Sequence, residues 1–234
     1  MPRTNGLVLR KAEVKDNDRI FTLFSEDLGK ISVLAKGAKS YKRDLLNGSR
    51  PFCYGQYVLT QRKNLFGVSE CTPIENFFAL SKDLDRLQAG TRFLEFVNAV
   101  TLEHEPVPDL LRVTLNCLHA LANTDKPPLL VQYAFYVRAL DALGFSPEIH
   151  GCTACGKEQS LTCFSISYGG VLCADCAKNV QDTIPINPEM LATLAYILDT
   201  PIPKMLSFTA ARDVLTRLFN LIVSFTLHHL DYKI

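Results

Sequence analysis

The segment RIFTLFSEDLGKISVLAK, residues 19–36, consists of two short runs rich in β-branched and aromatic residues around a polar centre. Such runs are typical of strands. Asp27-Leu28-Gly29 supplies the turn between them, because aspartate and glycine favour tight turns. The segment therefore predicts a β-hairpin, and the rest of the N-terminal region is interpreted around it.

Further strands are expected on both sides of this hairpin. One begins at Leu7-Val8-Leu9 and reaches the hairpin through the polar turn at residues 15–18. Two more are predicted at residues 52–61 and 68–78. A long loop at residues 37–50 separates them from the third strand. Five short strands with this spacing fit a small closed barrel that hides its edges, and an SH3-like barrel fits the count almost as well as an OB barrel.

From residue 82 the apolar period becomes helical. Apolar residues recur at helical spacing from Leu84 to Val100, and Pro106 and Pro108 mark the end of this helix. Gly144 is a plausible C-cap, and Pro188 suits the first turn of a later helix. The further helices are predicted at residues 110–122, 129–143, 187–198 and 209–230.

Cys152, Cys155, Cys173 and Cys176 form a C-x2-C-x17-C-x2-C array. This spacing is that of a tetrahedral zinc site, in which each pair occupies a short turn and all the thiolates converge on one ion. Four thiolates fill the coordination sphere, so we expect one structural Zn²⁺ rather than a catalytic one. The array is inserted between helices and encloses a small hairpin at residues 164–172, and zinc would stabilise an insert too small to bury its own core.

Other uses of the cysteines stay open. Two redox-active C-x-x-C pairs are one alternative, although that motif normally stands alone at the start of a helix in a βαβ unit. Disulfides of a secreted protein are another, but residues 1–6 lack the apolar core of a signal peptide. Cys163 or His150 would be substitute ligands. Buried free thiols are expected at the remaining positions, Cys53, Cys71 and Cys117.

The net charge of +1 is distributed unevenly. Residues 1–80 carry 13 Lys and Arg against 8 Asp and Glu, and residues 81–234 carry 12 against 16. No stretch approaches the roughly 20 apolar residues of a membrane span, since the best candidate, residues 215–230, is interrupted by polar side chains. We therefore expect a soluble, cytoplasmic protein with a basic N-terminal region.

The basic residues concentrate around the long loop. Residues 30–43 contain no acidic residue, and Tyr41 lies among the cations. Basic groups that line a groove attract phosphates, while aromatic faces stack on bases. The alternative is a solvated lysine-rich loop, with at least half of the aromatic residues in the core. The cations are Lys30, Lys36, Lys39, Lys42, Arg43, Arg50, Arg62 and Lys63, and the candidates for stacking are Tyr41, Phe52, Tyr54, Tyr57 and Phe66.

Enzymatic motifs are scarce in this sequence. It has no glycine-rich phosphate loop, G-x-S-x-G, H-E-x-x-H or paired acidic motif with metal-ligand spacing. A zinc-dependent hydrolase is a weak alternative, because all four cysteines of the array are used for coordination. The stronger rival to nucleic-acid binding is a non-enzymatic adaptor whose basic barrel docks an acidic partner peptide.

Six segments of the chain, in their order and spacing, resemble the RecO family of bacterial DNA repair proteins, and specifically its zinc-containing subgroup. These are GLVLR (6–10), DRIFTLFS (18–25), GKISVLAKGAK (29–39), LGFSP (143–147), CTACG (152–156) and GGVLCADC (169–176). Each motif is loose alone, but their combination is specific. The resemblance implies an α+β multidomain fold in which an N-terminal OB-fold β-barrel precedes an α-helical domain with an inserted four-cysteine zinc module.

On this resemblance the expected domains are an OB-fold at residues 1–80, helical parts at 81–145 and 181–234, and the zinc insert at 146–180. Family members are recombination mediators rather than enzymes. They bind single- and double-stranded DNA, anneal complementary strands, and work with RecR to load the RecA recombinase onto strands coated by single-stranded-DNA-binding protein. They also contact the acidic, hydrophobic C-terminal tail of that coat protein.

The resemblance also implies where this chain would act. It implies a nucleoid-associated protein with no membrane partner and no small-molecule substrate. The expected zinc ligands are the four cysteines of the array. The residues expected to bind DNA are Lys36, Lys39, Tyr41, Lys42, Arg43, Arg50, Arg62 and Lys63.

Overall fold

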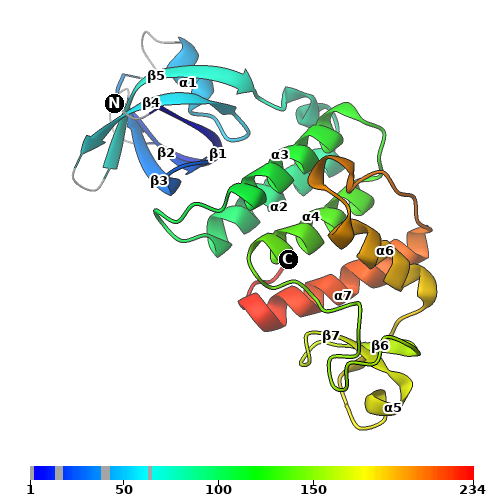
Figure 1. Cartoon of the computed structure of the whole chain (residues 1–234). Coiled ribbons are helices and arrows are strands. Elements are labelled where there is room, and N and C mark those ends of the chain that lie inside the picture. The colour runs from blue at the N-terminus through cyan, green and yellow to red at the C-terminus, as the bar shows by residue number, and fades with distance from the viewer. Residues whose placement is uncertain (1–2, 14–17, 38–42, 63–64) are drawn as a thin grey trace. The chain divides into compact units, whose positions relative to one another are not determined.

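A computed structural model describes residues 3–13, 18–37, 43–62 and 65–234 of the chain (Figure 1). The chain divides into two compact units, Met1–Thr124 and Asp125–Ile234. We call them the first and second unit. The finer domain boundaries expected from the sequence stay a prediction.

The first unit begins with a closed barrel of five strands in the order β1-β2-β3-β5-β4. Neighbouring strands are antiparallel, except that β3 and β5 pair in parallel through Val33 with Phe66 and Leu34 with Gly67. Strand β3 alternates buried and half-buried residues along its whole length, as the sequence predicts for one face turned to a core. The strands are β1 (Arg3–Glu13), β2 (Arg19–Ser25), β3 (Gly29–Ala35), β4 (Tyr54–Arg62) and β5 (Leu65–Glu75).

A short helix, α1 (Arg43–Gly48), occupies part of residues 37–50, which were predicted to form a loop. Leu45 belongs to the barrel core, and the hydroxyl of Tyr57 donates to the Gly48 carbonyl at 2.7 Å. The buried guanidinium of Arg19 donates to the Leu46 carbonyl at 3.1 Å and to the Ser49 hydroxyl at 3.0 Å. These tertiary contacts hold a helix too short to be stable alone.

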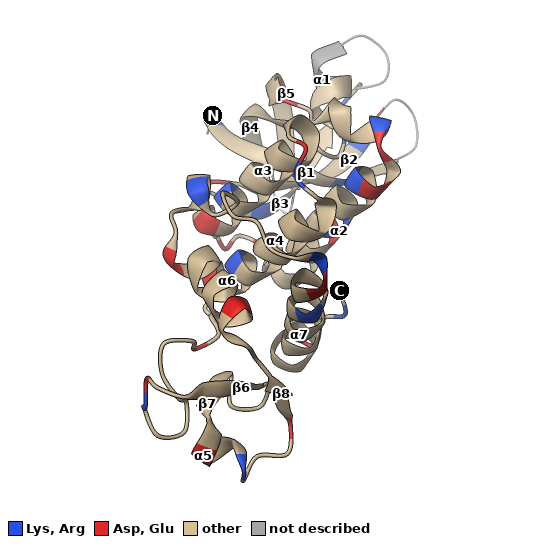
Figure 2. Cartoon of the chain, turned by 90° about the vertical axis from the view of Figure 1, so that its right-hand side faces the viewer, with Lys and Arg blue, Asp and Glu red and all other residues tan. Residues whose placement is uncertain are grey.

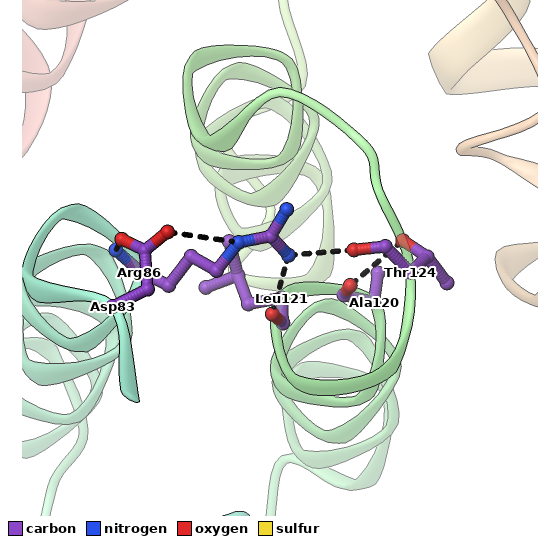
Figure 3. A network of polar contacts seen from close by, with 5 residues as sticks. All are labelled: Asp83, Arg86, Ala120, Leu121 and Thr124. Atoms are coloured by element: carbon purple, nitrogen blue, oxygen red, sulfur yellow. Dashed lines mark hydrogen bonds and ion pairs between the residues drawn. The ribbon is translucent and has the colours of Figure 1, made fainter. Parts of the chain in front are cut away.

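Two long helices complete the first unit after the turn η1 (Phe78–Lys82). They are α2 (Leu84–Val100) and α3 (Pro108–Asn123), close to the predicted ranges. Arg86 of α2 donates to the carbonyls of Leu121 at 2.7 Å and Thr124 at 2.6 Å (Figure 3). Its Nε lies 3.5 Å from a carboxylate oxygen of Asp83, which also caps α2. One side chain thus satisfies carbonyls at the C-terminal end of α3 and fixes that helix to α2.

The barrel is attached to the helices through the turn between β2 and β3. Gly29 has a positive φ of 66°, and a Cβ there would collide with the backbone of Glu105. The next residue, Lys30, donates from Nζ to the carbonyls of Asn98 at 2.7 Å and Thr101 at 2.5 Å. This lysine therefore caps the end of α2.

The second unit is a helical assembly with a small sheet. Helix α4 is buried along most of its length and packs with α6 and α7, and its C-terminal end has Gly144 at a positive φ of 83°, as predicted. Arg138 of α4 donates to the Leu198 carbonyl at 2.6 Å, which caps α6. The helices are α4 (Pro128–Ala142), α6 (Pro188–Asp199) and α7 (Arg212–Leu230), with a turn η2 (Ile202–Lys204) between the last two.

The cysteine module lies between α4 and α6 and contains a sheet of three strands in the order β7-β6-β8. The hairpin of β6 and β7 is the predicted one, whereas β8 was not predicted. The ring of Phe164 packs edge-on against Phe225 of α7 at 5.8 Å, which ties the sheet to the helices. The elements of the cysteine module are β6 (Leu161–Ser165), β7 (Gly170–Cys173), α5 (Ala174–Ala177) and β8 (Thr183–Pro185).

The predicted fold class is thus confirmed: an N-terminal five-stranded barrel of the OB type, followed by helices that carry a four-cysteine module in a small sheet region. Among the helices that the structure describes, none has the length and apolar content needed to cross a bilayer.

Candidate metal centre and nucleic-acid interface

The four predicted cysteines meet in space, and their Sγ atoms all lie within 4.8 Å of one another. The first pair lies on a tight turn. The Cys152 amide donates to the Lys157 carbonyl at 2.8 Å, and the amide of Gly156, which has a positive φ of 76°, donates to the Cys152 carbonyl at 2.7 Å. The second pair joins the last residue of β7, Cys173, to Cys176 in α5.

The cluster has the dimensions of a zinc site. A tetrahedral ion with Zn–S bonds of about 2.3 Å places its sulfurs about 3.8 Å apart. The Sγ atoms of Cys155 and Cys173, one from each pair, are 3.8 Å apart. Thiolates are soft ligands that select zinc over hard cations. The residues therefore fit a metal ion such as zinc.

The local electrostatics favour thiolates at two positions. For Cys152, burial acts to raise the pKa, but the backbone N–H groups of Cys173, Ala154 and Cys155 outweigh it and lower the pKa to about 6. The N–H of Cys176 likewise lowers the pKa of Cys173. Hydrogen bonds with the thiols of Cys155 and Cys173 raise the pKa of Cys176 to about 12, and a metal bound by this sulfur would displace its proton.

Charged side chains also connect the two pairs. Asp175 accepts from Lys157 and from Lys178, both at 3.3 Å, and both kinds of charge meet at α5 in Figure 2. Hydrogen bonds from Lys178 and Lys157 lower the pKa of Asp175. All three side chains are exposed, so each ion pair contributes little to stability. The sequence has no signal for these ion pairs, because only the fold brings Lys157 to Asp175.

The two substitute ligands do not join the cluster. Cys163 lies on β6, and the imidazole Nε2 of His150 is 3.3 Å from a carboxylate oxygen of Asp199. Four sulfurs in one group also favour a metal over two independent redox pairs. Cys53, Cys71 and Cys117 are buried and form no disulfide.

Strand pairing brings three loops of the barrel to one end. Arg19 at the start of β2 pairs with both Glu13 and Ala35. Strand β4 runs antiparallel to β1, so it starts at the end of the barrel where β1 stops. The connections β1–β2, β3–α1 and α1–β4 therefore share one end of the barrel, whereas the β4–β5 connection belongs to the other end, because β5 runs parallel to β3 and antiparallel to β4. Most of the cations expected to bind DNA belong to the connections of the shared end: Lys36, Lys39, Lys42 and Arg50.

The structure describes only part of that cation set. Lys36 directly follows β3 and is exposed, and Arg50 is exposed between α1 and β4. Arg43 begins α1 and Arg62 ends β4. The remaining residues expected to bind DNA lie outside the described residues: Lys39, Tyr41, Lys42 and Lys63.

Two residues from the wider set have structural roles instead. Lys30 caps α2, and burial lowers its pKa. Tyr57 is completely buried in the barrel core and was wrongly included among the candidates for base stacking. Phe52, by contrast, is half-buried and lines a pocket next to Arg50.

Comparison with known proteins accounts for nearly the whole chain. The family described as "Recombination protein O N terminal" matches residues 1–77, and "Recombination protein O C terminal" matches residues 81–234. The DNA repair protein RecO of Acetivibrio thermocellus is 35% identical over 217 residues, which cover 92% of this chain and 86% of that protein. RecO of Thermoanaerobacter sp. is 26% identical over 231 residues, covering 99% and 93%. The chain belongs to the RecO family of DNA repair proteins and has the four-cysteine cluster expected of its zinc-containing subgroup.

Proposed function

We propose that this protein is a recombination mediator that binds single- and double-stranded DNA and anneals complementary strands. In this proposal it also helps to load recombinase onto strands coated by single-stranded-DNA-binding protein, with RecR and the acidic tail of that coat protein as partners. It acts at the nucleoid by binding rather than by catalysis. Membership of the RecO family over both parts of the chain is the observation that carries the proposal.

The barrel supports DNA binding as the underlying activity. The connections at its shared end contain most of the proposed phosphate contacts, and two of these residues, Lys36 and Arg50, are exposed. Single-strand-binding barrels combine such a cationic path with aromatic faces. The proposed set comprises Lys36, Lys39, Tyr41, Lys42, Arg43, Arg50, Arg62 and Lys63.

The metal cluster supports a structural role for one zinc ion, held by Cys152, Cys155, Cys173 and Cys176. With all four positions occupied by sulfur, a bound ion would have no site for water or substrate. The cysteines hold the ion, the ion holds the module together, and DNA binding is assigned to the barrel.

Replacing Lys39, Lys42 and Arg43 together by alanine tests the proposed DNA path. Binding of a labelled single strand should weaken, and the slope of log K against log salt should become shallower by roughly 0.7 for each lost phosphate contact. The matched control removes three exposed cations from the second unit, Lys204, Arg212 and Arg217, and should leave the slope unchanged. A slope altered only in the control would place the DNA path on the helices.

Annealing separates a mediator from a simple DNA-binding protein. The proposal requires that the wild-type protein anneals complementary strands both when they are bare and when the coat protein covers them. Annealing confined to bare strands would reject the mediator function while leaving DNA binding intact.

A further inference from the structure

A cavity of about 250 Å³ opens in the first unit, where the segment after α1 faces η1 and the start of α2. Its lining includes Arg50 and Phe52 from the end of the basic segment, and Asn76 and Phe78 from the segment after β5. The cavity is slightly smaller than the range of about 300–1,000 Å³ that is usual for drug-sized ligands. It therefore suits one flat ring system rather than a helix or a large cofactor.

The aromatic side chains of this pocket are held in unusual positions. The ring of Phe78 is 71% exposed, although its backbone is fixed by a hydrogen bond from its N–H to Asn76 Oδ1 at 3.1 Å and by another from the Ser81 hydroxyl to its carbonyl at 2.8 Å. Phe52 and Phe77 both have positive φ, at 71° and 46°. Bulky residues rarely adopt this conformation, and such strain concentrates at binding sites.

Phe52 forms one wall of the pocket, and its ring packs against helix α2. A Cβ on Gly90 of α2 would approach its ring to 3.1 Å, so the glycine leaves room for the ring against the helix. Phe52 is thus supported from behind by α2, while Phe78 projects into solvent at the same pocket. The two rings offer apolar faces to an incoming planar group.

The polar groups of the pocket define the chemistry of that group. Arg50 is the one lining residue that carries a charge, and within the described part of the chain it makes no side-chain hydrogen bond or ion pair. Two side-chain amides, those of Asn47 and Asn76, also line the cavity. A ligand with an apolar face, hydrogen-bonding edges and an adjacent anion complements this set.

We propose that this pocket receives one unstacked nucleobase of a single strand, with an adjacent phosphate at Arg50. The inference rests on the proposed DNA binding and adds the position at which one base is turned out of the stack and bound by the protein. Continuity supports a nucleic acid over an acidic peptide, because residues 47–52 of the pocket continue directly from the cationic segment that begins at Lys36. Aromatic stacking holds any base in this way without selecting its sequence.

The experiment compares two single strands of equal length, one of deoxythymidine and one of abasic nucleotides, by fluorescence anisotropy. The abasic strand keeps the phosphates but has nothing to stack. Phe78→Ala should reduce affinity for the deoxythymidine strand by about five-fold or more, since one stacked base contributes about 1–3 kcal/mol, and should leave affinity for the abasic strand unchanged.

Two further variants make the result specific. Leu84→Ala removes a side chain of almost equal exposure, 69%, from the start of α2 outside the pocket, and should behave as wild type with both strands. Phe78→Tyr keeps the ring and should restore the preference for the strand with bases. A thermal unfolding curve for each variant confirms that it is folded at the assay temperature.

The outcomes distinguish failure of the pocket from failure of DNA binding. A wild-type protein that binds neither strand would overturn the proposed function and the pocket with it. A wild type that binds both strands equally, or a Phe78→Ala variant with the wild-type ratio of affinities, would overturn the pocket alone. If Phe78→Ala abolished binding of an acidic apolar peptide but left the affinity for DNA unchanged, the pocket would belong to a protein partner and the proposal would be rejected.

Discussion

At the scale of single residues, several cations stabilise helix ends instead of lying free on the surface. Lys30, Arg86 and Arg138 each donate to backbone carbonyls near the C-terminal end of a helix. Charge counting alone placed Lys30 in the same group as Lys36. The role of Lys30 depends on carbonyls that lie 68 and 71 positions further along the chain, so the local sequence has no signal for it.

Asp182 is a single residue whose role predicts a pH effect. Its carboxylate accepts from the Ser167 amide at 2.7 Å and the Ser165 hydroxyl at 2.9 Å, which joins the start of β8 to the β6–β7 turn. The hydrogen bond from the Ser167 amide holds the pKa of Asp182 below its ordinary 3.8. Asp182→Asn should therefore lower the free energy of unfolding by about 1–2 kcal/mol at neutral pH.

The sign of this pH dependence follows from the direction of the shift. A carboxylate with a lowered pKa stabilises the fold at pH values above its ordinary pKa, and this contribution is lost as the pH falls through the folded-state value. Urea titrations should therefore show a constant gap between wild type and variant at neutral pH that closes below pH 3.8. Glu158→Gln, an exposed control in the same module, should show no such gap, and a gap that widens in acid would contradict the assignment.

At the scale of elements, the patterns that arise locally were predictable and those made by tertiary contacts were not. The alternation in residues 29–35 and the helical period from Leu84 to Val100 appear in the structure nearly where they were predicted. Helix α1 and strand β8 were missed, because α1 depends on Arg19 and Tyr57 and β8 on pairing with β6. The ligand spacing predicted the cysteine cluster, whereas the pocket beside Phe78 joins segments about 30 residues apart and has no comparable motif.

The cysteine module predicts a stability effect at the same scale. Replacing Cys152 and Cys155 by serine should abolish stoichiometric zinc and lower the melting temperature by roughly 10 °C, because a structural metal contributes several kcal/mol to folding. Metal analysis and a thermal scan on freshly purified protein measure both effects. Cys163→Ser is the matched control, since Cys163 lies on β6 outside the cluster and its replacement should retain the metal. Zinc loss in the control would make Cys163 a ligand.

At the scale of the whole molecule, the metal and the proposed DNA surface belong to different compact units. The cysteines lie in Asp125–Ile234, and the barrel lies in Met1–Thr124. Chelation should therefore lower the thermal stability of the second unit and change single-strand affinity by less than about two-fold, if affinity is measured below the first unfolding transition. Affinity that falls in proportion to the metal removed would show that the module takes part in binding DNA.

The parallel pairing of β3 with β5 has a consequence for the chain as it is synthesised. Strand β1 pairs with β4, and β3 pairs with β5, and both partners are synthesised later. The barrel therefore remains open until the ribosome has released residues up to Glu75. During that interval two strand edges have no partner within the barrel, and unpaired edges invite association with other chains. Premature termination before residue 75 should therefore yield aggregating fragments, whereas a nascent chain that has passed this point can close its first unit.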